Sequence, residues 1–176
     1  LGLILIGRPR ARVAFTSDTL YVAIHCLDSA PETILATEMS RDARLFYDDS
    51  VEILLDTYHD RRNAYYFSTN PAGALVDGRI TENRYPDTNW DGIWDVKTRT
   101  DESGWTAEFE IPFKTLSFNP NSDSWGFNVA LIRDLTDCMY DPARPPYVSH
   151  DEGTRLVIEY IEKFWCPTVA SDQLLR

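Results

Sequence analysis

The chain has 176 residues, with 28 acidic and 17 basic side chains and a formal net charge of −11. This acidic balance disfavours binding to nucleic-acid backbones and to anionic membrane surfaces. Hydrophobic residues make up 43% of the chain and aromatic residues 12%, which is enough for a packed core, so global disorder is excluded.

Short strands separated by turns dominate the first half of the chain. The apolar run over residues 1–7 is shorter than the roughly 18 residues that a membrane helix needs, and we expect it to form a first strand. Apolar and alternating runs predict further strands, because both patterns bury one or two faces of a sheet. These strands are expected over residues 12–15, 20–27, 34–39, 51–55 and 64–68, with a polar loop over 40–50.

The second half continues this pattern after the turn Asn70-Pro71-Ala72-Gly73, in which Asn and Pro start the turn and Gly relaxes its backbone. The runs 94–100 and 105–111 alternate with period two and flank a turn, which predicts a hairpin. Strands are also expected over 74–80 and 125–133, an exposed loop over 85–92 and one helical turn over 112–116. Residues 156–165 fit either a helix or a strand.

About nine short strands with little helix predict an all-β fold, an antiparallel β-sandwich of two sheets in the jelly-roll or immunoglobulin-like class. A doubly wound α/β fold would need long amphipathic helices between the strands, and the sequence lacks them. We expect one domain over residues 1–176.

The sequence carries no pattern typical of an enzyme. His25, His59 and His150 lie far apart, outside any HExxH context, and no phosphate-binding loop or nucleophile elbow is present. The three cysteines form no CxxC pair, which argues against a zinc site. We therefore expect a non-catalytic domain.

Four segments in order resemble the family 9 carbohydrate-binding modules, as found at the N-terminus of larger bacterial cell-envelope proteins. They are "FTSDTLYVAIHCLD", "YDDSVEILLDTYHDRRNAYYFSTNPAGALVD", "WDGIWDVKTRTDESGWTAEFEIPFKTLSF" and "WGFNVALIRD". They contain a D-S-V-E strand, a G-W-x-x-E-x-x-I-P hairpin and a W-G-x-N strand, and the resemblance is strongest over residues 13–134.

The resemblance implies a saccharide site in which two aromatic rings clamp a terminal sugar and polar groups bond its hydroxyls. One ring would be Phe46, six residues before Glu52, with Tyr47 beside it, and the second would be Tyr140. Arg79 would donate to sugar hydroxyls, with a surface ion pair to Asp77 or Glu82 as the alternative.

Two further predictions come from the composition of the loops. Trp90 lies in a polar loop and is expected to be an exposed platform, whereas Trp94 is expected in the core. Asp56 and Asp60 stand in a charged turn and are candidate calcium ligands, as is the pair Asp48 and Asp49, with a solvated turn as the alternative.

Together these observations predict a non-catalytic module that binds the end of a saccharide chain, in an extracellular or periplasmic setting and as an accessory domain beside other domains of a parent protein. One alternative is a structural domain that docks onto such a neighbour without binding sugar. The other is non-covalent haem, with Met39 and His150 or Met139 and His25 as axial ligands. Covalent haem is excluded because no C-x-x-C-H motif is present.

Overall fold

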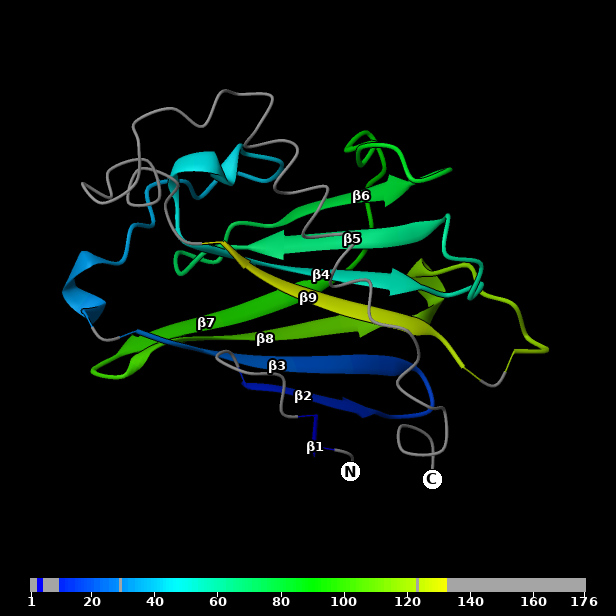
Figure 1. Cartoon of the computed structure of the whole chain (residues 1–176), viewed down its shortest axis with the longest axis horizontal. Helices are drawn as coiled ribbons and strands as arrows, with labels where there is room; N and C mark the ends of the chain where they lie inside the picture. The colour runs from blue at the N-terminus through cyan, green and yellow to red at the C-terminus, as the bar shows by residue number, and fades with distance from the viewer. Residues whose placement is uncertain (1–2, 5–9, 29, 123, 133–176) are drawn as a thin grey trace, which may run out of the picture.

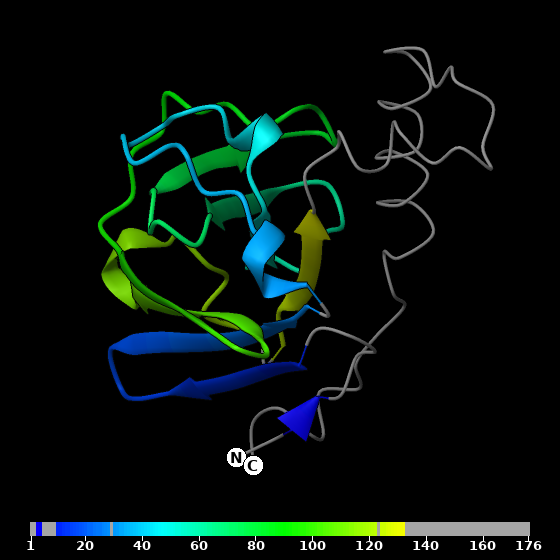
Figure 2. The ribbon, with the colours of Figure 1, turned by 90° about the vertical axis from the view of Figure 1, so that its left-hand side faces the viewer.

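Two antiparallel sheets face each other in the computed structural model, which describes residues 3–4, 10–28, 30–122 and 124–132 (Figures 1 and 2). One sheet has five strands in the order β1-β2-β3-β8-β7: Leu3–Ile4, Arg10–Phe15, Thr19–Leu27, Gly104–Pro112 and Asp95–Asp101. The other has four strands in the order β6-β5-β4-β9: Val76–Ile80, Ala64–Thr69, Ser50–Asp56 and Gly126–Ile132. Helical structure among the described residues is limited to three 3₁₀ turns: η1 Pro31–Thr33, η2 Leu45–Tyr47 and η3 Phe113–Thr115. The prediction of an all-β antiparallel sandwich is confirmed.

The core fills the space between the two sheets, and strand alternation decides which side chains enter it. Val22 and Ile24 of β3, Phe109 of β8, and Ile53 of β4 are almost fully buried. Successive side chains of a strand point to opposite faces, so each of these residues leaves its neighbours on the outer face. Trp94 joins the core as predicted, with its ring stacked on Phe109 at 5.7 Å between centroids.

Strand β8 begins with Gly104 and Trp105, and the geometry of its hairpin with β7 explains the glycine. Gly104 has a φ of +131°, and a Cβ there would lie 2.0 Å from the carbonyl oxygen of Cys26. Only glycine avoids both the backbone strain and this clash with β3. Trp105 follows and is buried, and the alternation from it predicts the buried face of β8 correctly.

Most predicted strands are found with small shifts in their ends, but one prediction is wrong. Residues 34–39 form no strand: the backbone amides of Leu35, Thr37 and Glu38 bind carboxylates instead of a neighbouring strand. The helical turn expected over 112–116 is present as η3. Within 1–7, Leu3–Ile4 is strand β1, and the segment 156–165 lies outside the described residues.

The outer edge of β6 is partly covered by its own following loop. Arg79 and Asp87 form an isolated bridge, with backbone N–H···O distances of 3.1 and 2.9 Å. Such pairing blunts an exposed edge that could otherwise add a foreign strand. None of the helical segments in the described ranges has the length and apolar character needed to cross a membrane.

Candidate functional site

Phe46 and Tyr47 form an exposed aromatic pair on η2, at the end of the sandwich where β4 begins (Figure 1). Phe46 is 53% exposed and Tyr47 is 65% exposed. Their rings meet edge to face, with centroids 5.2 Å apart and planes at 86°. Two large rings left in solvent cost hydration free energy, so their exposure indicates a binding surface.

Asp48, directly after the pair, fixes this part of the chain to the sandwich. It is buried, and its carboxylate accepts hydrogen bonds from the Thr37 N–H (3.0 Å), the Thr37 hydroxyl (2.7 Å), the Glu38 N–H (3.0 Å) and Asn70 Nδ2 (2.6 Å). Burial raises the pKa of Asp48, but the hydrogen bonds from Glu38, Thr37 and Asn70 together outweigh it and leave the pKa below its usual value.

The Asn-Pro turn supplies the other half of this anchor. Asn70 is fully buried; its Nδ2 also donates to the Glu38 carbonyl at 2.7 Å, and its Oδ1 accepts from the Ala74 N–H at 3.0 Å. Asp49 adds a second tie, because its carboxylate accepts from the Leu35 N–H and its own N–H donates to the Leu35 carbonyl. The carboxylates of Asp48 and Asp49 therefore act as anchors for residues 35–38. Because these backbone amides donate to carboxylates, they do not pair with a neighbouring strand, and residues 34–39 are irregular.

Glu52 lies on β4 with its side chain on the outer face of the four-stranded sheet. Val51 and Ile53 point into the core, so Glu52 points away from it. The Tyr66 hydroxyl donates to Glu52 Oε1 at 2.6 Å. Burial raises the pKa of the Glu52 carboxyl, and the hydrogen bond from Tyr66 only partly offsets this rise. Burial and the Glu52 carboxylate together raise the pKa of the Tyr66 phenol well above its usual value.

Ser68 completes a polar cluster on this outer face, which we call the Glu52 cluster (Glu52, Tyr66 and Ser68). Ser68 lies opposite Glu52 in the β4–β5 register and is 1% exposed. It lies close enough to Tyr66 to lower the pKa of that phenol slightly, yet its Oγ completes no well-formed hydrogen bond. A buried hydroxyl without a partner is costly, which marks it as a group that a ligand could satisfy.

Sequence reasoning missed Tyr66 and Ser68, although a signal was available. Both residues lie in the aromatic run that is predicted as a strand. Once the register between β4 and β5 is known, two-residue periodicity places Tyr66 and Ser68 on the same face as Glu52. The register depends on the turn before β5, which the sequence does not determine.

Arg79 and Trp90, both predicted to contact the sugar, lie on the other side of this sheet from Glu52. Arg79 is level with Tyr65 on β5, and its guanidinium lies over the Tyr65 ring at 5.6 Å. The side chain of Tyr65 is in the core, so Arg79 is on the inner face while Glu52 is on the outer one. Neither Asp77 nor Glu82 is the partner of Arg79: Asp77 pairs with Arg41, and Glu82 with Arg62.

Trp90 is not the exposed platform that its polar loop suggested. Its ring packs at 4.9 Å from that of Tyr65 and at 6.0 Å from that of Phe67, and it is only partly exposed. An aromatic ring gains more from this apolar contact than from water, so the loop folds back over the core. The structure therefore brings Phe46, Tyr47 and Glu52 to neighbouring positions of one segment and places Arg79 and Trp90 elsewhere. Tyr140 lies outside the described residues.

Asp56 and Asp60, the candidate calcium ligands, stabilise the turn between β4 and β5. Asp56 accepts from the N–H groups of Asp60 and Arg61, at 3.1 and 2.7 Å. Asp60 accepts from the N–H groups of Arg62 and Asn63, both at 2.8 Å, and from Asn63 Nδ2. Turn amides thus bind carboxylate oxygens that would otherwise face a cation, which favours the alternative of a solvated turn. Calcium binding here remains a prediction.

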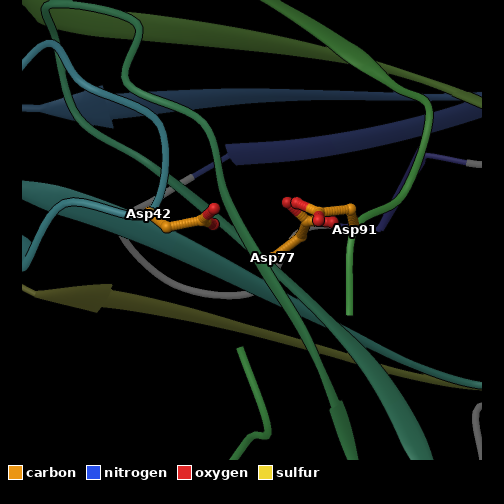
Figure 3. Close-up of side chains that lie close together, drawn as sticks. All are labelled: Asp42, Asp77 and Asp91. Carbon is orange, nitrogen blue, oxygen red and sulfur yellow. The ribbon is translucent and has the colours of Figure 1, made fainter. Parts of the chain in front are cut away.

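A different group of carboxylates, Asp42, Asp77 and Asp91, lies close together around an arginine. Their ligand oxygens lie within 4.8 Å of one another (Figure 3). Arg41 Nη2 donates to Asp77 at 2.6 Å and to the Gly92 carbonyl at 3.1 Å, and its Nε donates to Asp91 at 3.2 Å. The guanidinium supplies the positive charge that a metal ion would bring, so this group is a structural clamp.

The clamp joins the loop that carries η2 to β6 and to the segment around residue 91. Asp77 is fully buried; burial raises its pKa, and the Gly92 N–H and the Arg41 charge offset part of the rise. Each ligand pair of the haem alternative includes a residue outside the described ranges, His150 or Met139, so non-covalent haem stays a prediction. His25 is within hydrogen-bonding distance of Ser103, and Met39 is exposed.

Comparison with known proteins places this geometry in context. The family described as "Carbohydrate family 9 binding domain-like" matches residues 8–142. Similar solved structures include a family 9 carbohydrate-binding module from Caldicellulosiruptor kristjanssonii in complex with cellotriose (22% identity, TM-score 0.46, 71% of this chain and 57% of that chain). A family 9 carbohydrate-binding module from the same organism in complex with glucose is also similar, with 22% identity, a TM-score of 0.43 and coverage of 73% of this chain and 61% of that chain.

A putative carbohydrate-binding protein from Bacteroides uniformis ATCC 8492 is also similar, with 18% identity, a TM-score of 0.54 and coverage of 72% of this chain and 63% of that chain. This likeness shows the fold. The chain thus spans 57–63% of the length of these solved structures. No curated protein matches the chain.

Proposed function

The chain belongs to the carbohydrate family 9 binding domain-like family, and we propose that it binds the end of a saccharide chain on the outer face of the four-stranded sheet, beside the start of β4. The family is one of non-catalytic carbohydrate-binding domains, so the chain is a binding module and not an enzyme. The finer proposal, recognition of a chain end by aromatic stacking, depends on Phe46, Tyr47 and the Glu52 cluster.

The single observation that carries the proposal is the combination of two exposed rings before β4 with a half-buried polar cluster, on β4 and β5, that contains an incompletely bonded hydroxyl. Glu52 follows Tyr47 by five residues, so their Cα atoms lie within about 18 Å of each other. The C–H face of a sugar stacks on a ring, while its hydroxyls need planar polar partners beside it. Glu52 and Ser68 offer an acceptor and an unpaired hydroxyl.

The ring geometry supports a chain end as the preferred ligand. Phe46 and Tyr47 stand nearly perpendicular, at 86°, and so make a corner. A long flat polysaccharide would need a row of coplanar rings, which this pair does not provide. The alternative of a docking domain without sugar binding expected buried rings at this position; their exposure favours the binding module.

We expect this module to act in an extracellular or periplasmic setting, where saccharide chains are accessible, and to serve as an accessory domain of a parent protein. Membership of the family supports this setting, and the partial coverage of the solved structures is compatible with additional domains.

Isothermal titration calorimetry against a panel of mono- and oligosaccharides tests the proposal. The double variant Phe46→Ala with Tyr47→Ala is expected to weaken binding at least tenfold, because burying a large apolar side chain is typically worth about 1.5–3 kcal/mol. Tyr85→Ala is the matched control, since Tyr85 is equally exposed but lies in the loop after β6. If the folded wild-type chain binds no saccharide in the panel, the proposed function is wrong.

A further inference from the structure

Glu52 is a largely buried carboxyl group with no cationic partner among the described residues. Among the described residues, its side chain accepts one hydrogen bond, from the Tyr66 hydroxyl. The buried carboxylate of Asp77, in contrast, is neutralised by Arg41 at 2.6 Å. Buried charges are normally paired, because removing them from water costs far more than removing a neutral group. The exception at Glu52 therefore needs an explanation.

Among the residues that the structure describes, no basic side chain lies on the same face of the sheet as Glu52. Lys and Arg are absent from the outer face of β4, β5, β6 and β9 within the described strands, because Arg79 of β6 points to the inner face. The other charged side chain on this outer face is Asp56, which is also acidic. The outward-facing neighbours of Glu52 are Ser50, Leu54, Tyr66, Ser68, Asn128 and Ala130.

Two hydrogen-bonding positions remain open beside this uncompensated charge. Tyr66 occupies Oε1 of Glu52, and the described contacts give Oε2 no donor. Ser68 Oγ, on the neighbouring strand at the same level, lies beside the Tyr66 phenol but completes no well-formed hydrogen bond among the described residues. A carboxylate and a hydroxyl in this arrangement can receive O–H or N⁺–H groups, and charge-assisted bonds of this kind are the stronger ones. A second carboxylate would instead face a like charge in a partly desolvated place.

We propose that Glu52 makes the site charge-selective: it admits neutral and ammonium-bearing saccharide ends and rejects ends that carry a carboxylate. This inference rests on the proposed function, because it concerns the same site. It adds a residue that determines specificity and a class of ligand that is excluded. The raised pKa of Glu52 is consistent with it, since a group that lacks compensation is harder to ionise.

Titration calorimetry with matched sugars tests the inference. The probes are glucose, glucosamine and glucuronic acid, and galactose, galactosamine and galacturonic acid, measured at pH 7.5. In the wild type we expect the uronic acid of the binding series to be at least about tenfold weaker than the neutral sugar, since like charges brought together at an interface cost several kcal/mol. The amino sugar is expected to bind at least as tightly as the neutral one.

Glu52→Gln keeps the shape and an acceptor for Tyr66 but removes the charge, so it should bring the neutral and acidic sugars to within about threefold of each other. Glu110→Gln, on the outer face of the five-stranded sheet, is the control and should keep the wild-type ratio. If Glu52→Gln binds no sugar, the inference is tested by the wild-type affinities alone, which should be weakest for the acidic sugar.

Three results overturn the inference while leaving the proposed function in place: equal binding of the uronic acid and the neutral sugar, tighter binding of the uronic acid, or an unchanged ratio in Glu52→Gln. Absence of binding by every neutral, amino and acidic sugar is the different result that refutes the proposed function, and the inference falls with it.

Discussion

Replacing Asp48 by Ala removes the carboxylate that anchors the segment before η2. Four donors lose an acceptor: two backbone N–H groups, the Thr37 hydroxyl and Asn70 Nδ2. A hydrogen bond to a charged group contributes about 1.5–3 kcal/mol, so a simple sum would give about 6–12 kcal/mol.

The expected loss is smaller than that sum, for reasons visible in the structure. Thr37 and Glu38 are exposed, so water can bind the freed donors there. Asn70 is fully buried, but its Nδ2 keeps the bond to the Glu38 carbonyl. We therefore expect a loss of about 3 kcal/mol in the free energy of unfolding, which is typical of breaking a buried hydrogen-bond network. For a chain of this size the melting temperature should fall by about 6–12 °C.

Urea denaturation of the wild type and of Asp48→Ala measures this difference directly. Because the folded-state pKa of Asp48 lies below its ordinary value of 3.8, its contribution is complete above that value and is lost as the pH falls through the lowered pKa. The difference in the free energy of unfolding between the wild type and Asp48→Ala should therefore become smaller in strong acid. A loss below about 1 kcal/mol at pH 7, or a gap that does not change with pH, would refute the role given to Asp48.

Three further predictions concern stability. Glu52→Gln should raise the urea midpoint at pH 7.5. Burial raises the folded-state pKa of Glu52, so the stability of the wild type is highest below the ordinary carboxyl pKa and falls as the pH rises through the raised value. An unchanged urea midpoint would contradict this. Gly104→Ala should cost more than about 2 kcal/mol in thermal or urea unfolding, because its Cβ would clash with the Cys26 carbonyl; a near-neutral effect would show that the hairpin can shift. Arg41→Ala should cost about 3 kcal/mol by leaving the buried Asp77 unpaired, whereas Asp91→Ala, at an exposed partner of the same clamp, should cost less than about 1 kcal/mol; equal effects would refute the clamp.

Local periodicity accounts for most of the fold that could be predicted. In β8, Trp105, Ala107 and Phe109 are buried while Glu108 is exposed, so the two-residue pattern alone predicts both the strand and its inner face. The same reasoning fails for residues 34–39, because their amide partners are carboxylates ten or more positions away. Long-range capping of this kind leaves no periodic signal.

The candidate site was predictable only in part, for a similar reason. The motif around Glu52 and the rings before it are contiguous in sequence, on η2 and on the strand β4 that follows it. The family resemblance implies that Arg79 belongs to the same site, but one residue of register decides which face a side chain occupies. Trp90 shows the other limit: a polar loop predicts exposure, and tertiary packing on Tyr65 overrides it.

The most direct test of the central claim is to locate a bound saccharide by amide chemical-shift mapping. The ¹⁵N-labelled chain is titrated with the tightest sugar from the calorimetric panel. We expect the amide resonances of η2, the first residues of β4 and Ser68 to shift together with one dissociation constant, while those of the turn over 57–63 and of β7 do not shift. Shifts centred on the five-stranded sheet or on that turn, with none around Glu52, would contradict it.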